Sequence, residues 1–131
     1  MSDPPKTKRR VLVVEDEVLV GMLVEDMLGE LGCEVAALSS HLDQALQIAA
    51  SGTFDFAVLD VNLNGRHSFP VADVLRGRGV PFLFATGYGA NILPERHADA
   101  VILHKPFSLD ELRAGLARLF PLPDQGQGTP G

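Results

Sequence analysis

The sequence predicts an α/β fold in which helices cover both faces of a doubly wound, parallel five-stranded sheet. Three observations predict it. Short apolar runs alternate with segments whose apolar residues recur at helical spacing. The runs are continuously apolar, which is typical of strands buried on both faces. Four of the five runs end in polar residues, and open parallel sheets bind ligands beyond the carboxyl ends of their strands. We therefore expect the strand order 2-1-3-4-5 with right-handed crossovers.

The five expected strands are short and bounded by polar or turn residues. They are Val11–Val14, Glu34–Leu38, Phe56–Leu59, Val80–Ala85 and Ala100–Leu103. Between them we expect helices over 18–31, 41–51, 68–76, 90–98 and from 108 onward. The first is indicated by its apolar positions, which are Leu19, Met22, Leu23, Met27 and Leu31.

The ends of the later helices carry specific signals. Ser68 followed by Pro70 suits a helix start, and we expect Gly77 and Gly79 to end that helix. Pro94 interrupts the segment 90–98, which we therefore expect to be short, shifted or mobile. In the last helix Ser108 and Glu111 form a capping box, and four residues face inward: Leu109, Leu112, Leu116 and Leu119.

The composition bounds the class of protein. With 131 residues and 46% hydrophobic content, the chain suits one domain, which we place at 10–120. We expect a disordered arm at 1–9 and a disordered Pro/Gly-rich tail at 121–131. The net charge of −6 argues against direct nucleic-acid binding. The single Cys33, the absence of a long apolar run and a start without a signal peptide indicate a soluble, cytoplasmic protein.

Polar residues at the strand ends indicate the chemistry. Glu15 and Asp16 follow the first strand, Asp60 ends the third, and Thr86 and Lys105 follow the fourth and fifth. Each alone is ordinary, but together they meet at one edge of the sheet. Three carboxylates against one ammonium leave a formal charge of −2, which calls for a cation, and a few hard oxygen ligands favour Mg²⁺. The histidines at 41, 67, 97 and 104 lack the spacing of a zinc site.

This arrangement suits phosphoryl transfer, in which positioning and charge neutralisation supply most of the catalysis. Asp60 would be the nucleophile and would form an aspartyl phosphate. The same residues, in the same order and at the family's spacing, make 10–120 resemble the receiver domain of two-component response regulators: Glu15, Asp16, Asp60, Thr86 and Lys105–Pro106. The resemblance implies a flavodoxin-like (βα)5 fold and a phosphoprotein that acts in a phosphorelay.

The resemblance also implies roles for single residues. Glu15 or Asp16, with Asp60 and the backbone carbonyl of Asn62, would hold Mg²⁺. Thr86 would bind phosphoryl oxygens.

Lys105 would bind them as well, aimed into the site by a cis bond to Pro106. The chain would catalyse only its own phosphorylation and dephosphorylation, so it is not an enzyme in the usual sense.

Three features depart from the family pattern. Ile102 stands where receivers commonly carry an aromatic switch residue, and the usual Met-Pro after the acceptor is replaced by residues 62–65. The helix over 90–98 is weak. The run 84–88 resembles the FATGUY subclass of receivers, which are often stand-alone proteins. The candidate switch residues are Thr86, Gly87, Tyr88 and Ile102, with a packing role for Tyr88 left open.

Three functions compete. In the first, a sensor histidine kinase or a histidine phosphotransfer protein donates to Asp60, and the output is a contact with another protein or a phosphate sink. Phosphorylation would change the face formed by the fourth helix, the fifth strand and the last helix. Because this face could also pair two copies of the chain, both a monomer and a homodimer stay open. In the second, the chain is an interaction module that is never phosphorylated. In the third, it is an aspartate-nucleophile phosphatase, which would need an acid where Asn62 stands. None of the three requires a membrane.

Overall fold

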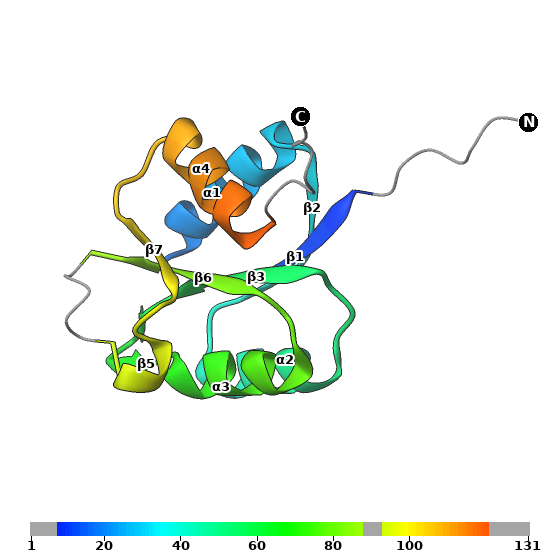
Figure 1. Cartoon of the computed structure of the whole chain (residues 1–131). Coiled ribbons are helices and arrows are strands. Elements are labelled where there is room, and N and C mark those ends of the chain that lie inside the picture. The colour runs from blue at the N-terminus through cyan, green and yellow to red at the C-terminus, as the bar shows by residue number, and fades with distance from the viewer. Residues whose placement is uncertain (1–7, 88–92, 121–131) are drawn as a thin grey trace, which may run out of the picture.

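The computed structural model describes residues 8–87 and 93–120, and it consists of three layers (Figure 1). A central sheet lies between one layer made by α1 and α4 and another made by α2 and α3. Of the expected arm and tail, only Lys8 and Arg9 lie within the described residues, and Arg9 already belongs to the first strand. Among the described residues, no helix has the length and the apolar character needed to span a membrane.

The sheet has the expected topology. Its five parallel strands are β1 (Arg9–Val14), β2 (Cys33–Ser39), β3 (Phe56–Asp60), β6 (Phe82–Thr86) and β7 (Val101–His104). Their order is β2-β1-β3-β6-β7, which confirms the predicted order because β6 and β7 are the fourth and fifth strands of this sheet. A separate antiparallel pair, β4 (Asn62–Leu63) and β5 (Arg66–His67), was not predicted.

Four α-helices lie within the described residues. They are α1 (Val18–Glu30), α2 (Leu42–Ser51), α3 (Phe69–Arg78) and α4 (Leu109–Leu119). The capping box at the start of α4 is confirmed, because the Ser108 side chain accepts from the Glu111 N–H and the Glu111 side chain accepts from the Ser108 N–H. The same helix buries Leu112 and packs Leu116 and Leu119 against the core.

One helix prediction needs correction, and another is met by a single short turn. Gly77 does not end α3, which continues to Arg78; only Gly79, whose φ of 74° lies in the left-handed region, ends it. The segment 90–98, which we expected to be short, shifted or mobile, contains in its described part a 3-10 turn at Glu95–His97, which begins after Pro94. Proline fits such a start because its missing N–H is not needed there.

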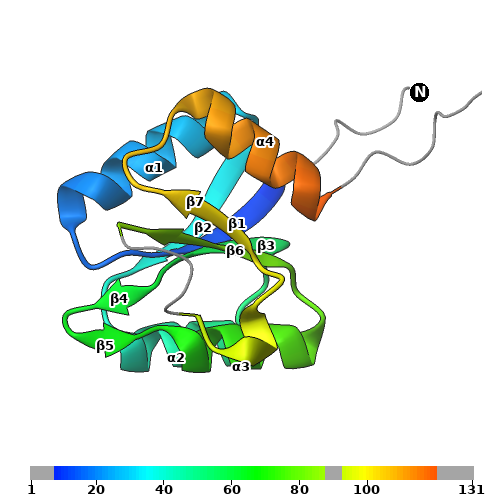
Figure 2. The same cartoon turned by 60° about the vertical axis from the view of Figure 1, so that its left-hand side comes forward.

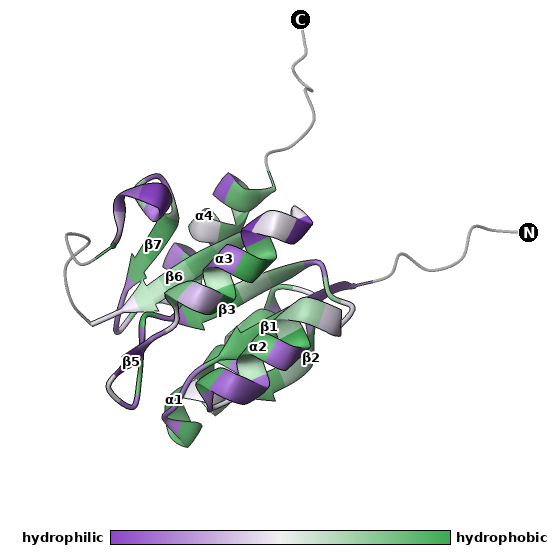
Figure 3. Cartoon of the chain, turned by 90° about the horizontal axis from the view of Figure 1, so that it is seen from below, coloured by the Kyte–Doolittle hydropathy of each residue, from purple (hydrophilic) through white to green (hydrophobic). Residues whose placement is uncertain are grey.

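The core forms two clusters, one on each face of the sheet. Leu12 and Leu59 point toward α2 and α3, whereas Val13 and Val58 point toward α1 and α4. Successive residues of a strand face opposite sides, so continuous apolar runs fill both clusters. In Figure 3 the strands are mainly green, and α2 and α3 carry purple residues among green ones. The sheet is therefore buried on both faces.

Helix α1 differs from its sequence-based description. The helix exists, but its buried residues are Gly21, Val24 and Leu28. Of the apolar side chains that indicated the helix, Met27 and Leu31 pack against the core. Others lie on its outer side, where Val18, Leu19, Met22 and Leu23 are between 53% and 80% exposed. Helical periodicity located the element correctly but did not separate the residues that pack on the sheet from those that face outward. We call these four residues the α1 stripe.

The segment after the fourth strand is fastened to α3 by charged groups. Asp73 accepts two hydrogen bonds from Arg96, at 2.7 and 3.0 Å, and lies 2.8 Å from Nε2 of His97. Arg76 lies 3.2 Å from Nδ1 of His97 and 3.8 Å from Asp99. Because a guanidinium only donates and a carboxylate accepts, these contacts fit the tautomer of His97 that donates from Nε2 and accepts at Nδ1. We call these five residues the α3 cluster.

Candidate functional site

Three carboxylates meet at the carboxyl edge of the sheet. Asp60 ends β3, and Glu15 and Asp16 follow the neighbouring strand β1. One oxygen from each of the three lies within 4.8 Å of the others. Two of the three, Asp16 and Asp60, line a hollow of about 400 Å³ together with Lys105. The parallel topology explains this convergence, because neighbouring parallel strands end at the same edge.

Lys105 is the cation of this group. Its Nζ lies 3.0 Å from Oε1 of Glu15 and 3.2 Å from Oδ2 of Asp60. The backbone N–H of Lys105 donates to the carbonyl oxygen of Thr86 at 2.8 Å, so the end of β6 positions the lysine. The peptide bond between Lys105 and Pro106 is cis. One ammonium thus forms ion pairs with two buried carboxylates.

Burial sets the protonation of this group. Glu15 and Asp60 are only 4% and 6% exposed. Burial raises the pKa of Glu15 to about 7, although the hydrogen bond to Lys105 acts to lower it. Burial also raises the pKa of Asp60, although the charge of Lys105 acts to lower it. For Lys105 itself, burial acts to lower the pKa, but the carboxylates of Glu15 and Asp60 raise it overall. The lysine therefore stays charged, and one ammonium does not fully offset the burial of two carboxylates.

Asp16 behaves differently from the other two acids. It is less buried, and its Oδ2 accepts a hydrogen bond from the backbone N–H of Asn64 at 2.8 Å. Burial acts to raise the pKa of Asp16, but hydrogen bonds, that from Asn64 first among them, lower it overall. Asp16 is consequently a carboxylate that is already ionised and oriented.

The loop after Asp60 forms one wall of the hollow. Asn62, Asn64 and Gly65 all line it, and they belong to the hairpin made by β4 and β5. The N–H of Asn62 donates to Oδ1 of Asp60 at 3.3 Å, and its side-chain oxygen accepts from the N–H of Gly65 at 3.0 Å. Figure 2 shows this hairpin at the same edge of the sheet from which α1 starts. Asn62 is thus placed beside the acids.

The candidate switch residues lie in different surroundings. Thr86 is buried at the end of β6, in register with His104, and Gly87 lines the hollow. Ile102 is half-buried and packs on the core cluster shared with α2 and α3. Tyr88 lies outside the described residues.

Two features of this edge were missed from the sequence. One is the hydrogen bond from Asn64 to Asp16; the Asn64–Gly65 dipeptide, typical of two-residue hairpin turns, was the available signal. The other is an apolar groove of about 300 Å³ that runs between α1 and the β7–α4 connection, lined by residues that include Leu23, Lys105 and Phe107. No local sequence pattern predicts this groove, because its two sides come from segments that are distant in the sequence.

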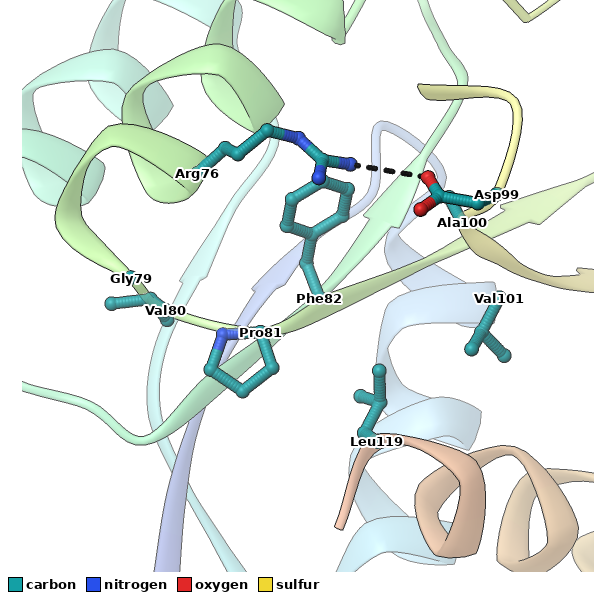
Figure 4. Close-up of a pocket in the computed structure, with 9 residues that line it drawn as sticks. All are labelled: Arg76, Gly79, Val80, Pro81, Phe82, Asp99, Ala100, Val101 and Leu119. Carbon is teal, nitrogen blue, oxygen red and sulfur yellow. Dashed lines mark ion pairs between the residues drawn. The ribbon is translucent and has the colours of Figure 1, made fainter. Parts of the chain in front are cut away.

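A second hollow, of about 420 Å³, lies where β6 and β7 begin (Figure 4). There Arg76 extends over the ring of Phe82 and pairs with Asp99. The other lining residues include Val80, Pro81 and others without charge. Its one acid is matched by its one base, so it lacks the excess of carboxylates found at the opposite edge.

Comparison with known proteins decides the family. Residues 11–117 match the response regulator receiver domain. The chain belongs to this family. It is 32% identical over 108 residues to the transcriptional regulatory protein PdtaR of Mycobacterium tuberculosis, covering 79% of this chain and 53% of PdtaR. It is 37% identical over 124 residues to TcrA of the same organism, covering 87% and 48%. The chain thus spans about half the length of these curated relatives.

Solved receiver structures share the fold. SdrG from Sphingomonas melonis Fr1 superposes with a TM-score of 0.78 at 38% identity, covering 87% of this chain and 98% of SdrG. The receiver domain of PhyR from Erythrobacter litoralis gives 0.77 at 26% identity, covering 95% and 97%.

Magnesium has been seen in one of these related receivers. The receiver domain of the sensor histidine kinase PA1611 from Pseudomonas aeruginosa, with a TM-score of 0.68 at 27% identity and covering 86% of this chain and 97% of that one, was solved with a magnesium ion in its active-site cleft. The present residues fit such an ion. They offer clustered hard oxygen atoms and, with three acids against one lysine, an excess of negative charge.

Proposed function

We propose that this receiver accepts a phosphoryl group on Asp60 from a sensor histidine kinase or a histidine phosphotransfer protein, in a reaction that needs Mg²⁺. The observation that carries the proposal is the meeting of Asp60, two further acids and Lys105 at one edge of a buried sheet. The proposal places the reaction in the cytoplasm.

The residues divide the work. A carboxylate oxygen of Asp60 attacks the phosphorus, the phosphorus–nitrogen bond of the donor phosphohistidine breaks, and the electron pair of that bond leaves with the imidazole. Asp16 and Asp60, with the backbone carbonyl of Asn62 and with Glu15 beside them, would hold the ion, which neutralises the phosphoryl oxygens when bound. Lys105 and Thr86 would bind those oxygens once the lysine turns from the Asp60 carboxylate.

The surroundings of the site suit a protein donor. The α1 stripe is exposed and apolar, and in Figure 3 the first turns of α1 are coloured green. The groove between α1 and the β7–α4 connection reaches from Leu23 to Lys105. Exposed apolar patches of this kind mark interaction sites. We place the donor on the α1 stripe, with its phosphohistidine over Asp60.

The output completes the proposal. A change at Thr86 would alter the face formed by β7 and α4, with Ile102 within β7, and that face would contact a downstream protein or a second copy of the chain. A role as a phosphate sink would need no such contact. Residues 84–87 match the start of the FATGUY motif, which supports membership of that subclass.

The test measures phosphoryl uptake by mass spectrometry after incubation with acetyl phosphate and Mg²⁺. The wild-type protein should gain one phosphoryl group and Asp60→Asn none, while the control Asp110→Asn, at an exposed position in α4, should behave as wild type. Uptake that survives in Asp60→Asn would contradict the proposal. A wild-type protein that is never phosphorylated would identify an interaction module, and continuous release of phosphate from phosphomonoesters would identify a phosphatase.

A further inference from the structure

The turn of the β4–β5 hairpin contacts one of the three acids directly. Asn64 and Gly65 have φ angles of 52° and 85°, as in the two-residue turns that join antiparallel strands. Within this turn the N–H of Asn64 donates to Oδ2 of Asp16, which is 48 residues away in the sequence. This hydrogen bond therefore links Asp16, which follows β1, to the loop that follows β3.

The hairpin is itself held in place. Leu63 is buried in the core cluster on the α2–α3 side, and the Asn62 side chain bonds to the N–H of Gly65 across the turn. Because the hairpin is anchored in this way, the Asn64 N–H orients the Asp16 carboxylate even when no cation is bound.

We propose that the Asn64–Gly65 turn is a positioning element for the cation of this site: it holds the Asp16 carboxylate in the orientation in which it binds Mg²⁺. This inference rests on the proposed function. Hydrogen-bond partners of a metal-binding carboxylate fix its orientation, and ligand groups that are ordered in advance bind more tightly. The turn acts through the Asp16 carboxylate, which accepts a hydrogen bond from its N–H.

The test compares two glycines that share a backbone conformation. Gly65 and Gly79 both have positive φ, both are exposed, and a Cβ at either would meet nothing within 4 Å. Valine strains the backbone at either position, so Gly65→Val and Gly79→Val should lose similar thermal stability. Only Gly65→Val should bind Mg²⁺ more weakly, by about threefold to tenfold in a calorimetric titration. At saturating Mg²⁺ its rate of uptake from acetyl phosphate should return to within about twofold of wild type, because Asp60 and Lys105 are unchanged.

Amide hydrogen exchange without Mg²⁺ tests the contact itself. The Asn64 amide should be protected in the wild type and in Gly79→Val, and should exchange faster in Asp16→Ala and in Gly65→Val. Equal Mg²⁺ affinity in the two glycine variants, or an Asn64 amide as exposed in the wild type as in Asp16→Ala, would overturn the inference. A wild-type protein that binds Mg²⁺ but takes up no phosphoryl group would overturn the proposed function alone. A wild-type protein that binds no Mg²⁺ would overturn both.

Discussion

Two clusters of charged residues lie on this receiver, and they differ in balance. In the α3 cluster, two carboxylates face two guanidinium groups and the imidazole of His97. At the carboxyl edge of the sheet, three carboxylates face the single ammonium of Lys105. The balanced cluster fastens one segment to a helix, whereas the unbalanced one leaves negative charge for a cation to neutralise.

The two clusters shift the pKa of the same residue type in opposite directions. The hydrogen bond from Arg96 lowers the pKa of Asp73, whose side chain is partly exposed. Burial raises the pKa of Asp60, even though Lys105 lies 3.2 Å away. An acid with its own base and access to water is a stable ion. An acid that shares one base in a buried place is poised to gain a cation.

Among the described residues, Lys105 is the base that pairs with Glu15 and Asp60, and removing it should have the largest effect. In Lys105→Met the buried carboxylates lose their partner, so we expect a loss of about 3 kcal/mol in the free energy of unfolding at pH 8 without Mg²⁺. Urea denaturation measures it, with exposed Lys8→Met as the control. The loss should shrink at pH 6, where carboxyl groups of raised pKa take up protons. An equal loss at both pH values would contradict the imbalance described here.

The stability of the metal-free wild type should fall as the pH rises. The folded-state pKa of Glu15, about 7, lies above the unfolded value of 4.5, so its contribution is fully present below pH 4.5 and is lost as the pH rises through 7. Between pH 5 and pH 8 this amounts to about 2–3 kcal/mol. Urea midpoints across this range measure it, and both Glu15→Gln and added Mg²⁺ should flatten the dependence. A wild-type free energy of unfolding that rises with pH over this range would contradict the prediction.

Breaking the α3 cluster should cost less and leave the chemistry intact. Asp73→Ala removes the acceptor of the buried His97 Nε2, which should lower stability by about 1–2 kcal/mol. Asp110→Ala, at an exposed ion pair in α4, is the matched control and should change little. Thermal melts measure both, alongside uptake from acetyl phosphate. Slower uptake by Asp73→Ala at a temperature where it is fully folded would show that the two clusters are not independent.

The sequence predicted those parts of the site that depend only on strand direction. Buried strands that end in Glu15, Asp60 and Lys105 must bring these residues to one edge, whatever the helices do. The capping box of α4 was visible because its signal is local. The exposed side of α1 was not, since the helix is apolar nearly all round and only packing selects Val24 and Leu28 for burial.

Contacts between distant segments that do not follow from strand direction were not predicted from the sequence. Asp73 and His97 belong to different elements, and no spacing rule joins them. The same holds for Asp16 and Asn64, although the turn that contains Asn64 has a local signature. Backbone geometry was thus predictable at the turn, while the partner of its N–H was not.

Calorimetric titration of Mg²⁺ into the metal-free protein at pH 7.5 tests most directly whether the unbalanced cluster is the cation site. We expect one saturable site in the wild type and in Asp73→Ala, and binding that is weaker by at least about tenfold in Asp60→Asn, which removes one of the three carboxylates. No binding by the wild type, or equal affinity in Asp60→Asn, would contradict the account.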